Sequence, residues 1–106
     1  MANNGRRTLA EVDDYAGLIH ALRQRAMELN ITRETIDELA GLPQRYTAKL
    51  LGLQFSRALG PISLGPILQA LGLRLVVVED EQAIAKMRPR LVPRKRPWPA
   101  ERAPIG

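Results

Sequence analysis

The sequence predicts a mainly α-helical protein, in which a bundle of short helices is followed by one β-strand. Two observations predict this fold. Apolar residues recur at helical spacing in several stretches, most of them closed by a glycine or an asparagine. The β-branched residues that favour strands form one run, at residues 73–79. The chain has 106 residues, of which 45% are apolar, and this is enough for one domain with a modest core.

The first expected helix ends at Leu29. Asp13 is its N-cap, Asp14 adds negative charge to its first turn, and Asn30 ends it. Residues 1–12 are expected to form a flexible arm. The apolar residues of this helix fall on one face over four turns: Tyr15, Leu18, Ile19, Leu22, Ala26 and Leu29.

Two shorter helices joined by a tight turn come next. Thr32 caps the first of them, residues 33–40, and Gly41 supplies the left-handed residue that ends it. The second covers residues 43–51 and begins with a proline, whose fixed backbone angle suits a first helical turn; Gly52 closes it. In the helix at residues 33–40, the side chains expected to be buried are those of Ile36, Leu39 and Ala40.

The rest of the chain holds a fourth helix, the strand and a last helix. Residues 53–62 are expected to be irregular, and Ser63 caps a helix over residues 64–71. The strand at residues 73–79 has no evident second strand in the chain, so we expect it to pair antiparallel with its copy in a homodimer. Asp80 caps the last helix.

These elements define the expected domains. A helix-turn-helix domain covers residues 13–87, and a basic, proline-rich tail covers residues 88–106. The first 85 residues hold nine basic and ten acidic side chains, whereas the last 21 hold seven basic ones and one acid. We expect the tail to be disordered, because proline and like charge cannot build a core. Three roles are open for the tail: it binds DNA phosphates, it binds a partner, or it only keeps the chain in solution.

Composition argues against several classes of function. The chain has no cysteine, so it holds no disulfide and no thiolate metal site. His20 is the only histidine, and no serine or acid is placed to make it a catalytic base. No stretch approaches the roughly 18 apolar residues of a membrane span, and the first residues lack the apolar core of a signal peptide. We therefore expect no enzyme activity, metal, cofactor or membrane association, and a cytoplasmic location.

The tight turn between the second and third helices carries the functional prediction. Such a turn makes the following helix protrude, so that it can enter a DNA major groove. Gln44 and Arg45 can then pair with adenine and guanine, and Lys49 can reach a base or a phosphate. Arg33 and the free amides of the helix that Thr32 caps suit a phosphate.

Other side chains of these two helices are not assigned to a DNA contact by the same argument. Tyr46 either stacks on the sugar-phosphate backbone or is half-buried beside the first helix. The acids of the first short helix are expected to face away from DNA: Glu34, Asp37 and Glu38.

Over residues 15–71 the sequence resembles the XRE family, the lambda-repressor-like or Cro/C1-type helix-turn-helix regulators. The resemblance is best in Ile31–Leu42 and Leu68–Leu73. It implies a lambda-repressor-like helical bundle, a phosphate contact at Arg33, and base-reading positions at Gln44, Arg45 and Lys49. The strand after the fourth helix resembles the dimerising strand of HipB-like antitoxins, a branch of that family.

The sequence departs from the family at two places. Thr47 stands where the family usually has a large aliphatic residue. The third helix ends in Leu51, Gly52 and Leu53, where the family usually has an acid, a polar residue and a glycine. We expect Leu51 and Leu53 to pack on a neighbour.

Three functions are compatible with these features. The first is a sequence-specific transcriptional regulator, a repressor, that binds double-stranded DNA as a homodimer. The second is the antitoxin of a toxin–antitoxin pair, which binds its toxin and its own operator. The third is a helix-turn-helix fold that serves only protein–protein contact, with weak, sequence-blind DNA affinity.

Overall fold

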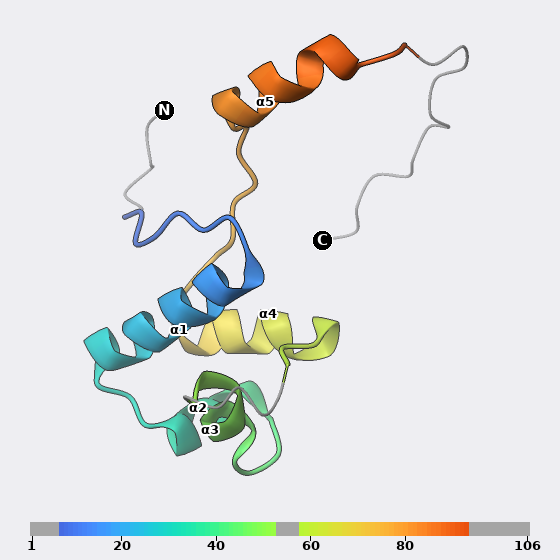
Figure 1. Cartoon of the computed structure of the whole chain (residues 1–106). Coiled ribbons are helices and arrows are strands. Elements are labelled where there is room, and N and C mark those ends of the chain that lie inside the picture. Colours follow the sequence, from blue (N-terminus) through green and yellow to red (C-terminus); the bar gives the residue numbers. More distant parts are fainter. Residues whose placement is uncertain (1–6, 53–57, 94–106) are drawn as a thin grey trace. The chain divides into compact units, whose positions relative to one another are not determined.

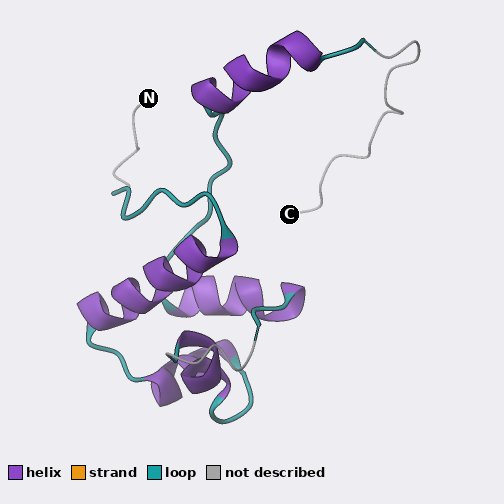
Figure 2. Ribbon diagram, in the orientation of Figure 1, coloured by secondary structure: helices purple, strands orange, loops and turns teal. Residues whose placement is uncertain are grey.

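The computed structural model describes residues 7–52 and 58–93, which fold into two compact units, residues 1–75 and residues 76–106 (Figure 1). Within the described residues all regular structure is helical (Figure 2), so the mainly α-helical fold is confirmed. None of these helices is long and apolar enough to cross a membrane. The elements are α1 (Tyr15–Leu29), α2 (Arg33–Ala40), α3 (Tyr46–Leu51), α4 (Pro61–Ala70), α5 (Glu81–Met87) and a 3-10 helix (Arg88–Arg90).

Helix α1 ends where predicted but begins one residue later, with a different cap. The side chain of Asp14, not Asp13, accepts a hydrogen bond from the Gly17 amide at 2.8 Å. The carboxylate directly before the helix has the extended backbone that an N-cap needs, which explains the shift by one residue. Asn30 ends the helix in the left-handed conformation, as predicted.

The arm before α1 is described from Arg7 onward; residues 1–6 of the predicted flexible arm lie outside the described residues. Arg7 forms an ion pair with Glu28 on α1 at 3.0 Å. A hydrogen bond from Arg25 and the charge of Arg7 hold the pKa of Glu28 below its ordinary value. These exposed pairs are therefore lost when the pH falls through the lowered pKa of Glu28.

Helix α2 has the predicted bounds and caps but buries a different set of residues. Thr32 accepts a hydrogen bond from the Thr35 amide at 3.1 Å, and Gly41 ends the helix with a φ of 68°. The prediction for Leu39 is wrong: its side chain is 63% exposed. Asp37 is buried instead, because the face of α2 that carries it packs toward the start of α3.

Helix α3 begins at Tyr46, three residues later than predicted. Pro43 therefore does not open the helix, and Gln44 lies in the turn that precedes it. The reason is Arg45, which has a φ of 67° and cannot continue a right-handed helix backward. At the other end Gly52 follows the helix, as predicted, and a Cβ there would lie 2.6 Å from the Ala48 carbonyl oxygen.

Helix α4 begins before the predicted Ser63. Gly60 is the N-cap and Pro61 the first helical residue, a position where the fixed φ of proline costs nothing. The amides of Ser63 and Leu64 donate to the Gly60 carbonyl oxygen, so Ser63 is a buried residue of the first turn and not a cap. The prediction for Leu53 and most of the irregular stretch fall on residues 53–57, outside the described residues.

One apolar core joins the first four helices. Helix α2 packs on both α3 and α4, and α1 packs on α3. Leu51 is buried, as predicted, and the core has no buried side-chain polar atom without a hydrogen bond among the described residues. The buried apolar residues are Ile19, Leu22, Ala26, Ile36, Tyr46, Leu50, Leu51, Ile67 and Leu71.

The second unit, residues 76–106, holds α5 and the 3-10 helix. Asp80 caps α5, as predicted, by accepting hydrogen bonds from the amides of Gln82 and Ala83 at 3.0 and 3.2 Å. No residue of the described range 76–93 is buried. The first three residues of the predicted tail form the 3-10 helix, and its residues 94–106 lie outside the described residues.

The segment that connects α4 to α5 is the predicted strand, residues 73–79. It lies outside any helix or strand, so the single chain does not confirm the strand. Among the described residues, the backbone of residues 74–79 makes no hydrogen bond. The side chains are exposed as well, and Val77 is 99% exposed. The segment therefore offers both backbone groups and apolar side chains to a neighbour.

Candidate DNA-binding face

The predicted site residues lie around the turn between α2 and α3 and at the start of α2. Gln44 and Arg45 lie in the turn, Lys49 lies on α3, and Arg33 is the first residue of α2. All four are exposed, and within the described part of the chain their side chains make no hydrogen bond or ion pair. They are therefore available to a ligand.

Arg45 holds an unusual backbone conformation at this site. Its φ of 67° is in the left-handed region, which a side chain other than glycine or asparagine adopts at a cost of about 1 kcal/mol. The conformation turns the chain directly into α3, and the Arg45 carbonyl oxygen accepts the Lys49 amide at 3.0 Å. A glycine would adopt this conformation without that cost.

Tyr46 is placed inside the molecule and not on this face. It is 8% exposed, and its hydroxyl donates to the Ala58 carbonyl oxygen at 3.5 Å. Of its two expected roles, the structure therefore favours burial over stacking on a sugar-phosphate backbone. Thr32 is exposed, and its hydroxyl is taken up by the cap of α2 and by a 2.8 Å contact with the Thr35 hydroxyl.

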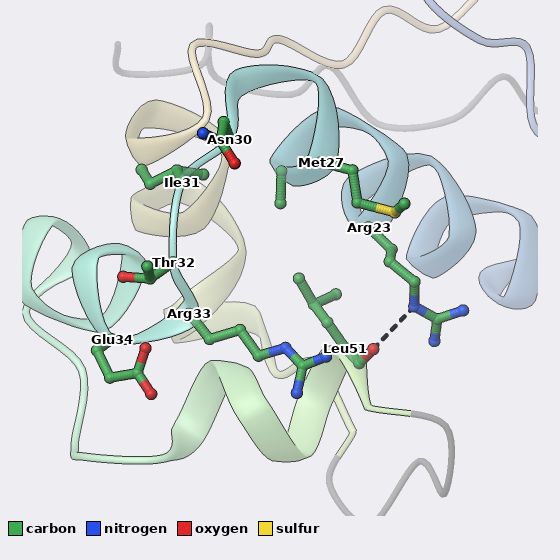
Figure 3. Close-up of a pocket in the computed structure, with 9 residues that line it drawn as sticks. Arg23, Met27, Asn30, Ile31, Thr32, Arg33, Glu34 and Leu51 are labelled. Atoms are coloured by element: carbon green, nitrogen blue, oxygen red, sulfur yellow. Dashed lines mark hydrogen bonds between the residues drawn. The ribbon is translucent and has the colours of Figure 1, made fainter.

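A hollow of about 460 Å³ lies between the end of α1, the start of α2 and the end of α3 (Figure 3). Arg33 extends toward Leu51 from one side of this hollow, and Arg23 extends toward it from the other. Glu34 lines the same hollow. Gln44, Arg45 and Lys49 do not line it.

The start of α3 is held by Asp37 of α2, one of the acids expected to face away from DNA. Asp37, which is 5% exposed, accepts hydrogen bonds from the Thr47 amide at 2.9 Å and from the Thr47 hydroxyl at 2.6 Å. The carboxylate thereby caps α3 from a different helix. Thr47 is fully buried, and this partner explains why a hydroxyl is tolerated in the core.

The end of α3 is held by a residue that the sequence did not single out. Arg23, on α1, donates from Nε to the Leu51 carbonyl oxygen at 2.8 Å (Figure 3). It also donates from Nη2 to the Gly52 carbonyl oxygen at 3.2 Å. Its neighbour Arg25 makes the same kind of contact with the Leu71 carbonyl oxygen at the end of α4, at 2.9 Å. Helix α1 thus supplies a cationic cap to two other helices.

One sequence signal could have revealed the first of these contacts. A threonine at an expected core position requires a hydrogen-bond partner, and Asp37 lies ten residues before it in the sequence. No local signal marks Arg23, because its acceptors are backbone carbonyls that every helix end exposes.

Comparison of the chain with protein families, with curated proteins and with solved structures finds no match.

Proposed function

We propose that the chain is a sequence-specific DNA-binding regulator of the helix-turn-helix type, acting as a repressor and related to the XRE family. One observation carries the proposal. Gln44, Arg45 and Lys49 are exposed and without partners in the described chain, and they lie at the tight turn and on the helix that follows it. Two of these side chains are cationic, and amide and guanidinium groups are the donors that read adenine and guanine edges.

The start of α2 fits a phosphate contact. Arg33 extends into the hollow (Figure 3), and the amides of Arg33 and Glu34 open the first turn of α2, where the helix dipole favours an anion. In this proposal Arg33 binds a phosphate and fixes the orientation of the domain, while Gln44 and Arg45 distinguish bases.

Selection of bound sequences from random DNA tests the function. The full-length protein should enrich one sequence and bind it at least about 1,000-fold more tightly than random DNA at physiological salt. Binding that is weak and equal for all sequences would refute sequence-specific regulation, and would favour a helix-turn-helix fold used only for protein contact. If a toxin encoded by a neighbouring gene binds the same protein, the antitoxin function is favoured within the same DNA-binding class.

We further propose that two copies pair through residues 73–79. The backbone groups of residues 74–79 are unpaired among the described residues, and the apolar side chains of Leu75 and Val77 would lie on one side of an extended strand. A copy of the same segment, related by a two-fold axis, satisfies both needs. Such a dimer presents two α3 helices to half-sites about one turn of DNA apart.

Replacing Val77 with proline should convert this dimer into monomers. Proline removes one ladder donor and blocks the pairing, whereas the control Val77→Thr keeps the amide and a β-branched side chain. Sedimentation at tens of micromolar, roughly, should show a dimer for the wild type and for Val77→Thr and a monomer for Val77→Pro, which should bind DNA far more weakly. A wild-type protein that sediments as a monomer would contradict the pairing.

Neutralising Glu34 should strengthen DNA binding, because it removes a negative charge from a residue that lines the same hollow as Arg33. Glu34→Gln should raise the affinity for every sequence by about threefold at low salt, and the gain should shrink as salt is added. Glu38→Gln is the matched control: Glu38 is also exposed and on α2 but does not line the hollow. Equal gains from both variants would mean that only net charge matters and that the hollow receives no phosphate.

A further inference from the structure

Helix α3 is too short to hold its own position. It has six residues, and Arg45 at its N-cap offers no side-chain hydrogen bond to it. An isolated helix of this length is not stable in water, since it makes too few hydrogen bonds to offset its nucleation. The orientation of α3 is therefore set by what holds its two ends and by the core beneath it.

The two ends are held by side chains of opposite charge from two other helices. Asp37 of α2 accepts the Thr47 amide and hydroxyl at the start of α3. Arg23 of α1 donates to the Leu51 and Gly52 carbonyl oxygens at its end. The signs match the helix dipole, which is positive at the start and negative at the end.

Burial makes the first contact especially restrictive. Asp37 and Thr47 are both buried, so a carboxylate oxygen that moved away would leave two donors without an acceptor. The contact at the other end uses two nitrogens of one planar guanidinium on two successive carbonyls, which fixes direction as well as distance.

We propose that Asp37 and Arg23 are positioning residues for DNA reading: they hold α3 from both ends and so set sequence discrimination. The inference rests on the proposed function. Base edges accept a bidentate side chain only within a narrow geometry, whereas phosphate contacts tolerate displacement of the helix. Loosening either end therefore lowers the preference for the selected sequence and leaves nonspecific affinity largely unchanged.

Two matched pairs of variants separate positioning from stability. Thr47→Val removes the hydroxyl that Asp37 accepts, whereas Thr47→Ser retains it. Arg23→Gln removes the guanidinium at the end of α3, whereas Arg25→Gln removes the corresponding contact at the end of α4, which carries none of the proposed base-reading residues.

The quantity measured is the ratio of the dissociation constants for random DNA and for the selected sequence, at a temperature where circular dichroism shows each variant folded. Thr47→Val and Arg23→Gln should lower this ratio by about tenfold, while Thr47→Ser and Arg25→Gln keep it within about twofold. Affinity for random DNA should stay within about threefold throughout.

Three outcomes would contradict the inference or the function on which it rests. A wild-type protein that discriminates, with Thr47→Val and Arg23→Gln discriminating equally well, overturns the positioning inference alone. An equal loss in Arg25→Gln also overturns it, because the effect would then be general destabilisation. A wild-type protein without any preferred sequence overturns the proposed function, and the inference with it.

Discussion

Replacing Asp37 with alanine should lower the free energy of unfolding by about 2–4 kcal/mol. The variant leaves the Thr47 amide and hydroxyl buried without an acceptor, and each unsatisfied buried donor costs about 1–3 kcal/mol. It also removes the cap of α3, which has no side-chain cap of its own. Urea unfolding followed by circular dichroism at neutral pH measures the loss.

The double variant Asp37→Ala with Thr47→Val identifies the cause. Removing the hydroxyl takes away one of the two stranded donors, so the double variant should be less destabilised than the sum of the single ones, by about 1 kcal/mol or more. Purely additive losses would show that the two side chains act independently, and a loss below about 0.5 kcal/mol for Asp37→Ala would show that the carboxylate is not buried in solution.

The helices that could be predicted are those whose ends carry local signals. Thr32 and Gly41 bound α2 because a hydroxyl accepts a free amide and a glycine adopts a positive φ without cost, and both effects depend only on neighbouring residues. The start of α4 was misplaced because Gly60 followed by Pro61 competes with Ser63, and the sequence gives no measure of which cap is better satisfied.

The elements that could not be predicted depend on partners distant in space. An aspartate is almost never buried without a partner, so the sequence favours an exposed Asp37. Only the packing of α2 on α3 buries it against Thr47. The delayed start of α3 follows from a left-handed Arg45, a conformation that arginine does not favour and that no residue pattern announces. Residues 74–79 make no backbone hydrogen bond to the rest of the chain that the structure describes, so the predicted strand does not form there.

The same distinction between local and tertiary signals holds for the residues of the candidate site. Gln44, Arg45, Lys49 and Arg33 could be identified because exposed polar side chains beside a tight helical turn depend on periodicity alone. The burial of Tyr46 and the two contacts that hold α3 required the tertiary structure, since they depend on how the helices pack.

Substitutions of Arg45 should separate stability from DNA binding. Arg45→Gly relieves the left-handed strain and should raise the free energy of unfolding by about 0.5–1 kcal/mol. The same change removes the proposed guanine contact and should weaken binding to the selected sequence by about 1–3 kcal/mol, with relaxed preference at one base pair. Unfolding in urea and binding to a panel of single-base variants of the site measure the two effects.

Arg45→Ala is the matched control, because alanine loses the guanidinium but retains a Cβ and with it the strain. It should weaken DNA binding as much as Arg45→Gly without the gain in stability. Equal weakening on all sequences by both variants would make Arg45 a phosphate contact, like Arg33, and not a base reader. If Arg45→Gly raises stability and abolishes discrimination, the left-handed backbone is retained for the contact that the arginine side chain makes with DNA.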